Sequence, residues 1–147
     1  MAFPSVEPLA RLAEDEDLRA LAEKAHAEVG LPGELTLDAS KLSRLDGALI
    51  VLRLPDEQPI GFAAVLVSPH PFAGGCVAHV QAFYVDENAR LPTRAVALFE
   101  AVLEHAKLRK ARWITACAPP DTPASVLFGR LMQRGESVYR LELPKCL

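Results

Sequence analysis

Residues 80–95 read Val80-Gln81-Ala82-Phe83-Tyr84-Val85-Asp86-Glu87-Asn88-Ala89-Arg90-Leu91-Pro92-Thr93-Arg94-Ala95, and this stretch decides the fold. It begins as an apolar strand, passes through a polar turn and continues as an amphipathic helix. A strand that runs into a helix N-terminus places unpaired backbone N–H groups and the positive end of the helix dipole at one point. Such a point binds phosphate or pyrophosphate. The stretch therefore predicts an anionic, nucleotide-like ligand.

The composition is typical of one ordinary globular domain. Of the 147 residues, 50% are hydrophobic and 24% are charged, which is sufficient for a packed core. The net charge of -3 argues against nucleic acid as the main partner. No apolar run approaches the roughly 20 residues of a membrane-spanning helix, and the N-terminus lacks the pattern of a signal peptide. We therefore expect no contact with a membrane.

The three cysteines, Cys76, Cys117 and Cys146, are widely spaced and odd in number. They fit neither a disulfide framework nor a zinc site, so we expect free thiols and no metal. Free thiols indicate a reducing cytoplasm, which is the host's cytoplasm if the gene belongs to a virus or mobile element. Because no His–Asp pair lies near Cys117 in the sequence, we interpret it as a buried structural thiol and not as a nucleophile.

Apolar spacing and turn residues predict alternating helices and strands. Residues 5–29 have helical spacing, which the acidic run 14–17 can divide into two helices, with Asp15 or Asp17 as the second cap and Gly30 as the end. A short helix follows Asp38. The remaining predicted elements are strands at 48–54, 60–67, 76–85, 112–117 and 137–143, a helix at 92–109, and a helix capped by Asp121.

This element order predicts a mixed α/β layer sandwich that begins with antiparallel hairpins and continues with an αβα segment. The order and the central segment resemble the GNAT acyltransferase superfamily over roughly residues 47–143. In that family, the strand before the central helix ends in Tyr/Phe-Val-x-Pro-x-x-Arg, and residues 83–90 stand in its place here. The family's pyrophosphate loop, Arg/Gln-x-x-Gly-x-Gly/Ala, corresponds to residues 90–95. Residues 124–131 and 135–141 are similar to its last helix and closing strand.

Several small phage- and prophage-encoded members of the family share a loop like Ser68-Pro69-His70-Pro71. The resemblance implies a single GNAT-like domain over residues 1–147, with N-terminal helices at 5–46 and a cofactor-binding core at 47–143. Its sheet would be mixed, mostly antiparallel and flanked by helices. Because the chain opens with helices, we expect the family's usual first strand to be missing or moved.

The resemblance implies acetyl-CoA as the cofactor. Its pantetheine arm would enter a gap between the strands that end near Val85 and Cys117, and would pair with a strand backbone there. The residues that would bind the cofactor are Phe83, Tyr84, Val85, Arg90, Leu91, Pro92, Thr93, Arg94 and Ala95.

The loop at 90–95 departs from the family pattern because it lacks glycine. Pro92 has no N–H to donate, although it suits a first helical turn. Thr93 carries a Cβ where backbone and phosphate would approach closely. Arg90 and Arg94 could replace the lost contacts with charge-assisted hydrogen bonds, or they could form a solvated surface pair.

The usual acid and base of the family are also replaced. Phe128 stands where the family has a tyrosine that protonates the leaving thiolate, and we expect Phe128 to pack in the core. Tyr139, on the predicted closing strand, is a weak substitute.

The third strand offers His79 and Gln81 where the family has a basic carboxylate. An imidazole near neutrality can take a proton from an amine, so His79 is the candidate base; the other interpretation is a hydrogen-bonded core histidine. Strict alternation places Gln81 on the same face as His79, together with Val77, Phe83 and Val85. We expect His70, in the loop after the second strand, and Gln81 to face an acceptor substrate, although His70 could equally be an exposed loop residue.

Two functions follow from these residues. The first is an N-acyltransferase that moves an acetyl group from acetyl-CoA to an amine of a small molecule or protein. The second is a catalytically degenerate GNAT-fold module that binds a protein partner. The arginines and the 83–85 strand favour the enzyme, whereas Phe128 and the glycine-poor loop favour the module. The sequence leaves the oligomeric state undecided, with a homodimer as one possibility.

Overall fold

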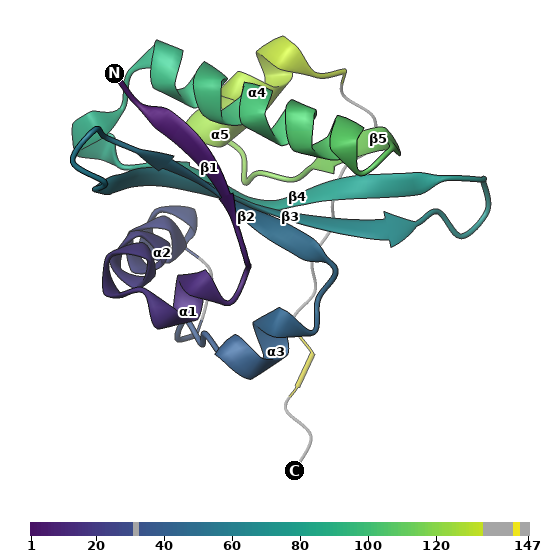
Figure 1. Cartoon of the computed structure of the whole chain (residues 1–147), viewed down its shortest axis with the longest axis horizontal. Helices are drawn as coiled ribbons and strands as arrows, with labels where there is room; N and C mark the ends of the chain where they lie inside the picture. The colour runs from purple at the N-terminus through teal and green to yellow at the C-terminus, as the bar shows by residue number, and fades with distance from the viewer. Residues whose placement is uncertain (31–32, 134–142, 145–147) are drawn as a thin grey trace.

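The computed structural model describes residues 1–30, 33–133 and 143–144. They form one α/β domain with a sheet between two layers of helices (Figure 1). The elements are β1 (Phe3–Glu7), α1 (Arg11–Glu14), α2 (Glu16–Val29), α3 (Ala39–Ser43), β2 (Gly47–Arg53), β3 (Pro59–Pro69), β4 (Cys76–Val85), a 3-10 helix (Glu87–Ala89), α4 (Pro92–Leu108), β5 (Ala111–Ala116) and α5 (Pro123–Leu131).

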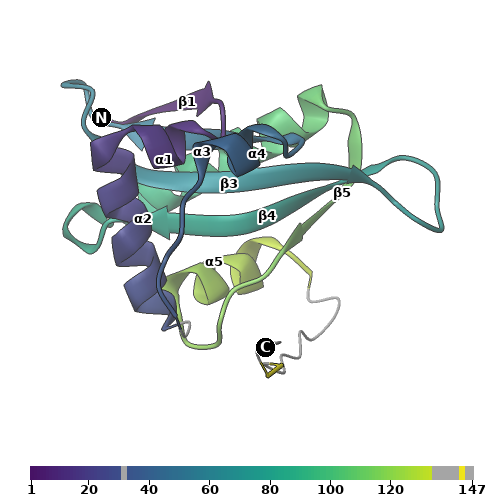
Figure 2. The ribbon, with the colours of Figure 1, turned by 90° about the horizontal axis from the view of Figure 1, so that it is seen from below.

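The sheet has five strands in the order β1-β2-β3-β4-β5. The first four are antiparallel neighbours, and β4 pairs with β5 in parallel through the α4 crossover. Figures 1 and 2 show α1, α2 and α3 on one face and α4 and α5 on the other. Helices cover both faces of the sheet, so both sides of β2 are shielded from water and residues 48–52 are all buried. This explains why β2 is apolar at consecutive positions and does not alternate with polar residues.

Local signals explain where most helices begin and end. Asp15 caps α2 by accepting from the N–H groups of Asp17 and Leu18, and Gly30 ends α2 with a positive φ of 69°. Asp38 caps α3 in the same way. These caps confirm the sequence prediction. The predicted cap of the last helix was wrong by one residue, because the Thr122 hydroxyl, not Asp121, accepts from the N–H of Ser125.

The prediction that the chain opens with a helix from residue 5, with no first strand, was wrong. Residues Phe3–Glu7 form β1, which pairs antiparallel with β2, and Val6 lies opposite Ile50. Short apolar spacing fits a helix or a strand equally, and the partner that decides between them is more than 40 residues away in the sequence. The prediction for residues 137–143 falls mostly outside the described residues.

A β-bulge in β4 determines which side chains face which helices. Ala82 pairs with Ala64 and Val80 with Val65, so Gln81 is an extra residue on β4. Val80 therefore packs with Phe83 in the core under α4 and α5, while Ala82 packs under α1 and α2. The predicted alternation was wrong beyond residue 80.

Candidate functional site

The edge of β4 is open beyond the bulge. The pairing of β4 with β5 ends at Val80 and Ala116, so residues 81–85 have no strand partner on that side among the described residues. The N–H of Asp86 donates to the carbonyl of Ile60 on β3. Because backbone groups alternate along a strand, the N–H and C=O groups of Phe83 and Val85 point away from β3, toward the open edge.

The N-terminus of α4 lies directly after this edge. Leu91 is the cap residue and Pro92 the first helical residue, as the sequence predicted. The N–H groups of Arg94 and Ala95 both donate to the Leu91 carbonyl. Among the described residues, the Thr93 N–H has no protein partner, so it is the first-turn donor that remains available to an anion.

Both arginines of the loop donate hydrogen bonds to backbone carbonyl groups and do not form a solvated pair. Arg90 donates from Nε and Nη2 to the Val85 carbonyl, at 3.2 and 2.8 Å, and its guanidinium lies 5.7 Å from the centre of the Tyr84 ring. Arg94 donates to the Ala89 carbonyl at 2.9 Å. Two cationic groups are thus fixed between the open edge and the start of α4.

Helix α2 is tied to the same junction by two ion pairs. Glu28 accepts from Arg90 at 3.0 Å, and Lys24 donates to Asp86 at 3.1 Å. The buried Tyr84 lies beneath them. Burial raises the pKa of Tyr84, and the carboxylates of Asp86 and Glu28 raise it further, so its phenol stays protonated at neutral pH.

A cavity of about 30 Å³ opens at this junction. Phe128 packs behind one lining residue: its ring lies edge-on to that of Phe83, with the ring centres 5.4 Å apart, and its ring centre is 6.2 Å from that of Phe99. Phe128 is a core residue, as predicted, with 8% of its surface exposed. The side chains that line the cavity are Glu28, Phe83, Tyr84, Val85, Arg90, Ala95, Pro123, Ala124 and Leu127.

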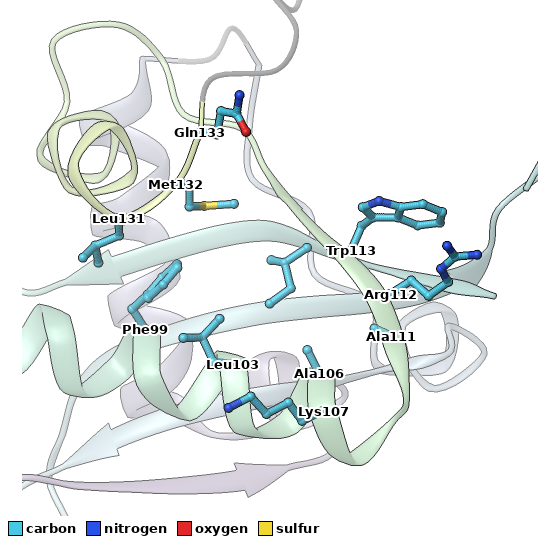
Figure 3. A pocket seen from close by; sticks show the side chains of 11 residues that line it. Phe99, Leu103, Ala106, Lys107, Ala111, Arg112, Trp113, Leu131, Met132 and Gln133 are labelled. Carbon is cyan, nitrogen blue, oxygen red and sulfur yellow. The ribbon is translucent and has the colours of Figure 1, made fainter. Parts of the chain in front are cut away.

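A larger groove of about 420 Å³ lies between α4, β5 and the end of α5 (Figure 3). Phe99, Leu103 and Met132 give it an apolar wall, and Lys107 and Arg112 supply its charges. The smaller cavity remains the candidate site, because helix terminus, strand edge and arginines converge there.

His79 lies on the sheet face that carries α1, α2 and α3, because its neighbour Val80 packs under α4. Its Nε2 is 3.1 Å from the Ser68 hydroxyl, and its Nδ1 is 2.7 Å from the Thr115 hydroxyl. His79 is half-buried and hydrogen-bonded on both nitrogens. It lies one residue before Val80, where β4 and β5 separate.

The other predicted residues lie in different settings. His70 accepts from the N–H groups of Phe72 and Ala73 through Nδ1, and its ring lies 5.2 Å from that of Trp113, so it holds its own loop. Gln81 is exposed at the bulge. The prediction that Cys117 is buried was wrong, because it follows the end of β5 and is exposed. Tyr139 lies outside the described residues.

The model of the Acetyltransferase (GNAT) family matches residues 14–132. The chain belongs to the GNAT acetyltransferase family. Comparison with curated proteins finds no match.

Solved structures of acetyltransferases share this fold. A ribosomal-protein-alanine N-acetyltransferase from Brucella melitensis biovar Abortus 2308 is 18% identical, with a TM-score of 0.76 over 97% of this chain and 99% of its own. An aminoglycoside acetyltransferase, HMB0005, from an uncultured soil metagenomic sample is 19% identical, with a TM-score of 0.76 over 99% of both chains. A putative acetyl transferase from Pyrococcus furiosus is 16% identical, with a TM-score of 0.70 over 99% of this chain and 100% of its own.

The junction carries hydrogen-bond donors and a positive charge, which suit the amide groups and the pyrophosphate of acetyl-CoA, the cofactor that GNAT proteins generally use. The open edge offers strand hydrogen bonds at Phe83, the α4 N-terminus offers the Thr93 N–H, and Arg94 supplies a cation. Among residues 1–30, 33–133 and 143–144, no helix is long and apolar enough to cross a bilayer, and no cluster of His, Cys, Asp and Glu could hold a metal ion.

Sequence reasoning missed Glu28, Ser68 and Thr115. Glu28 is 62 residues from Arg90, and Thr115 is 36 residues from His79. No local pattern marks them. Only the strand register and the docking of α2 bring them to the site.

Proposed function

We propose that this GNAT protein transfers an acetyl group from acetyl-CoA to an amine. The observation that carries the proposal is the open edge of β4 next to the α4 N-terminus, with Arg90 and Arg94 fixed between them. Acetyl-CoA supplies the activated acetyl thioester when bound.

In this proposal, the chain's own residues bind, orient and accept a proton. The backbone N–H and C=O of Phe83 and the N–H of Val85 hold the pantetheine arm as an added strand would be held, while the Val85 carbonyl accepts from Arg90. The Thr93 N–H and the two arginines hold the pyrophosphate. His79 accepts the proton that the attacking amine loses. Phe128 has no proton to give, so a leaving thiolate must be stabilised or protonated by another group, for which Tyr139 remains the sequence's candidate.

The acceptor is an amine of a small molecule or a protein. Two structures with this fold are named for such acceptors, namely the alanine of a ribosomal protein and an aminoglycoside. At identities of 18% and 19%, these names suggest which amines to test first.

The second candidate is a non-catalytic GNAT-fold module that binds a protein partner. The cavity of about 30 Å³ favours it, because small-molecule sites usually have preformed volumes of about 300–1,000 Å³. Phe128, which replaces the family's acidic tyrosine, packs against Phe99 and against Phe83, a lining residue of that cavity.

Calorimetry with CoA separates the two candidates. The enzyme should bind CoA. It should then transfer the acetyl group of acetyl-CoA to a peptide with an N-terminal alanine or to sisomicin, the aminoglycoside bound in a solved structure of an aminoglycoside acetyltransferase with this fold, and mass spectrometry detects the product. His79→Asn should fold normally, bind CoA and lower the rate by about 10²–10⁴. Wild-type protein that binds no CoA at millimolar concentration would leave only the module.

A cytoplasmic location, a phage origin and a homodimer remain predictions from the sequence. Light scattering on the purified protein tests the homodimer directly.

A further inference from the structure

A row of hydrogen-bonding side chains crosses three strands on the face opposite α4. Ser68 on β3, His79 on β4 and Thr115 on β5 form it, with contacts of 3.1 Å to Nε2 and 2.7 Å to Nδ1 of His79. Both hydroxyls can donate or accept, whereas a neutral imidazole donates from one nitrogen and accepts at the other. In each tautomer of neutral His79, one hydroxyl donates to the imidazole and the other accepts from it.

Exposure and register give the row an outer and an inner end. Thr115 is exposed, while His79 and Ser68 are half-buried. Thr115 pairs with His79 one position before Ala116, where β4 and β5 separate. Of the three side chains, the Thr115 hydroxyl is therefore the one that solvent and a molecule at the gap between β4 and β5 can reach most directly. Ser68 lies on β3, so β4 stands between it and the gap, which excludes Ser68 as a nucleophile there.

We propose that Thr115 relays the amine's proton to His79, with Ser68 as the positioning residue that fixes the imidazole; this rests on the proposed acetyl transfer. The N–H bond of the amine breaks, its electron pair stays on nitrogen, and the proton passes to Thr115 Oγ1. The hydroxyl's own proton moves to His79 Nδ1. The resulting imidazolium donates from Nε2 to Ser68 Oγ, and it returns the proton to solvent after the product leaves.

The relay requires one tautomer of resting His79. Nδ1 must accept from Thr115, so the proton must lie on Nε2 and point to Ser68. Nitrogen-15 NMR of the imidazole in the whole protein identifies the tautomer without any substrate. The Nε2–H tautomer supports the relay. The Nδ1–H tautomer overturns it, because that nitrogen could not accept a proton from Thr115.

Substitutions at Thr115 separate its hydroxyl from its shape. Thr115→Val keeps the side-chain shape and removes the hydroxyl, whereas Thr115→Ser keeps the hydroxyl. With the N-terminal alanine peptide or sisomicin as the acceptor, Thr115→Val should lower kcat by about 10²-fold and leave the KM for acetyl-CoA unchanged. Thr115→Ser should retain most of the wild-type rate.

The outcomes distinguish the relay from the function on which it rests. If Thr115→Val turns over at the wild-type rate while His79→Asn is slow, acetyl transfer stands and the relay is wrong. If neither probe is acetylated and CoA does not bind, the proposed function fails. The NMR measurement does not depend on acetyl transfer. Whether or not the protein acetylates a probe, a proton on Nδ1 of His79 rejects the relay, because Thr115 then cannot donate to that nitrogen.

Discussion

Arg90→Ala should weaken both CoA binding and the fold. Arg90 makes two hydrogen bonds to the Val85 carbonyl and one to Glu28, which join the open edge of β4 to α2. The Arg90 and Glu28 side chains are 28% and 32% exposed, so solvent screens their attraction only in part. At about 1.5–3 kcal/mol each, the three hydrogen bonds would contribute at most about 4.5–9 kcal/mol. Both side chains are partly exposed and water replaces part of what is lost, so we expect the measured loss to be about 1–3 kcal/mol.

The expected loss of CoA affinity has the same origin. One charge-assisted hydrogen bond to phosphate contributes about 1–3 kcal/mol, which corresponds to about a 5- to 150-fold rise in Kd. Urea denaturation gives the stability change, and calorimetry with CoA gives the Kd. Both are measured at a temperature where the variant is fully folded.

Lys24→Gln is the matched control. It breaks the other ion pair between α2 and the junction, the one with Asp86, without touching Arg90. It should leave the Kd for CoA within about twofold, because surface ion pairs contribute about 0–1 kcal/mol. A folded Arg90→Ala protein with the wild-type Kd would refute the proposal that Arg90 helps to hold the pyrophosphate of CoA.

Three further predictions concern stability. Asp15→Ala removes the acceptor for two backbone N–H groups at the start of α2 and should lower the free energy of unfolding by about 1–2 kcal/mol; an unchanged urea midpoint would contradict this. Gly61→Ala places a Cβ 2.8 Å from the Tyr84 carbonyl oxygen and should cost about 1–3 kcal/mol, whereas Gly129→Ala on α5 meets nothing within 4 Å and should stabilise slightly; the opposite order in thermal unfolding would reject the argument. Burial lowers the pKa of His105, whose Nε2 has no hydrogen-bond partner in the described part of the chain. As the pH falls below about 6.5, the ordinary pKa of histidine, the unfolded state therefore binds more protons than the folded state, and the free energy of unfolding falls. His105→Leu should remove this loss, and an equal stability difference between the two proteins at pH 7.5 and pH 5 would count against it.

Signals within a few residues predicted most of the elements correctly. Asp15 and Asp38 accept the hydrogen bonds of the helices that follow them, and Gly30 takes the left-handed conformation that ends α2. The β2, β3, β4, α4 and β5 segments were predicted to within a few residues. The error at β1 has a physical reason, since a strand of five residues is stabilised by its partner β2 and not by its own sequence.

The candidate site was predicted in part. The 80–95 stretch indicated a strand that leads into a helix, and the structure has this junction with Pro92 in the first helical turn. The contacts of Arg90 with Glu28 were not predictable, because α2 reaches the junction only when it packs on the sheet. Neither were the hydroxyl partners of His79, which come from the two neighbouring strands.

The sequence by itself determined the caps of α2 and α3, the apolar strands and the strand–turn–helix junction, because each depends on residues that are close along the chain. Only the tertiary structure decided which way the site faces. The bulge at Gln81 lies between His79 and Phe83 and turns their side chains to opposite faces of the sheet. At the bulge, β4 has one residue more than the stretch of β3 with which it pairs. A pairing register is a property of two strands together, so strict alternation along one strand could not reveal it.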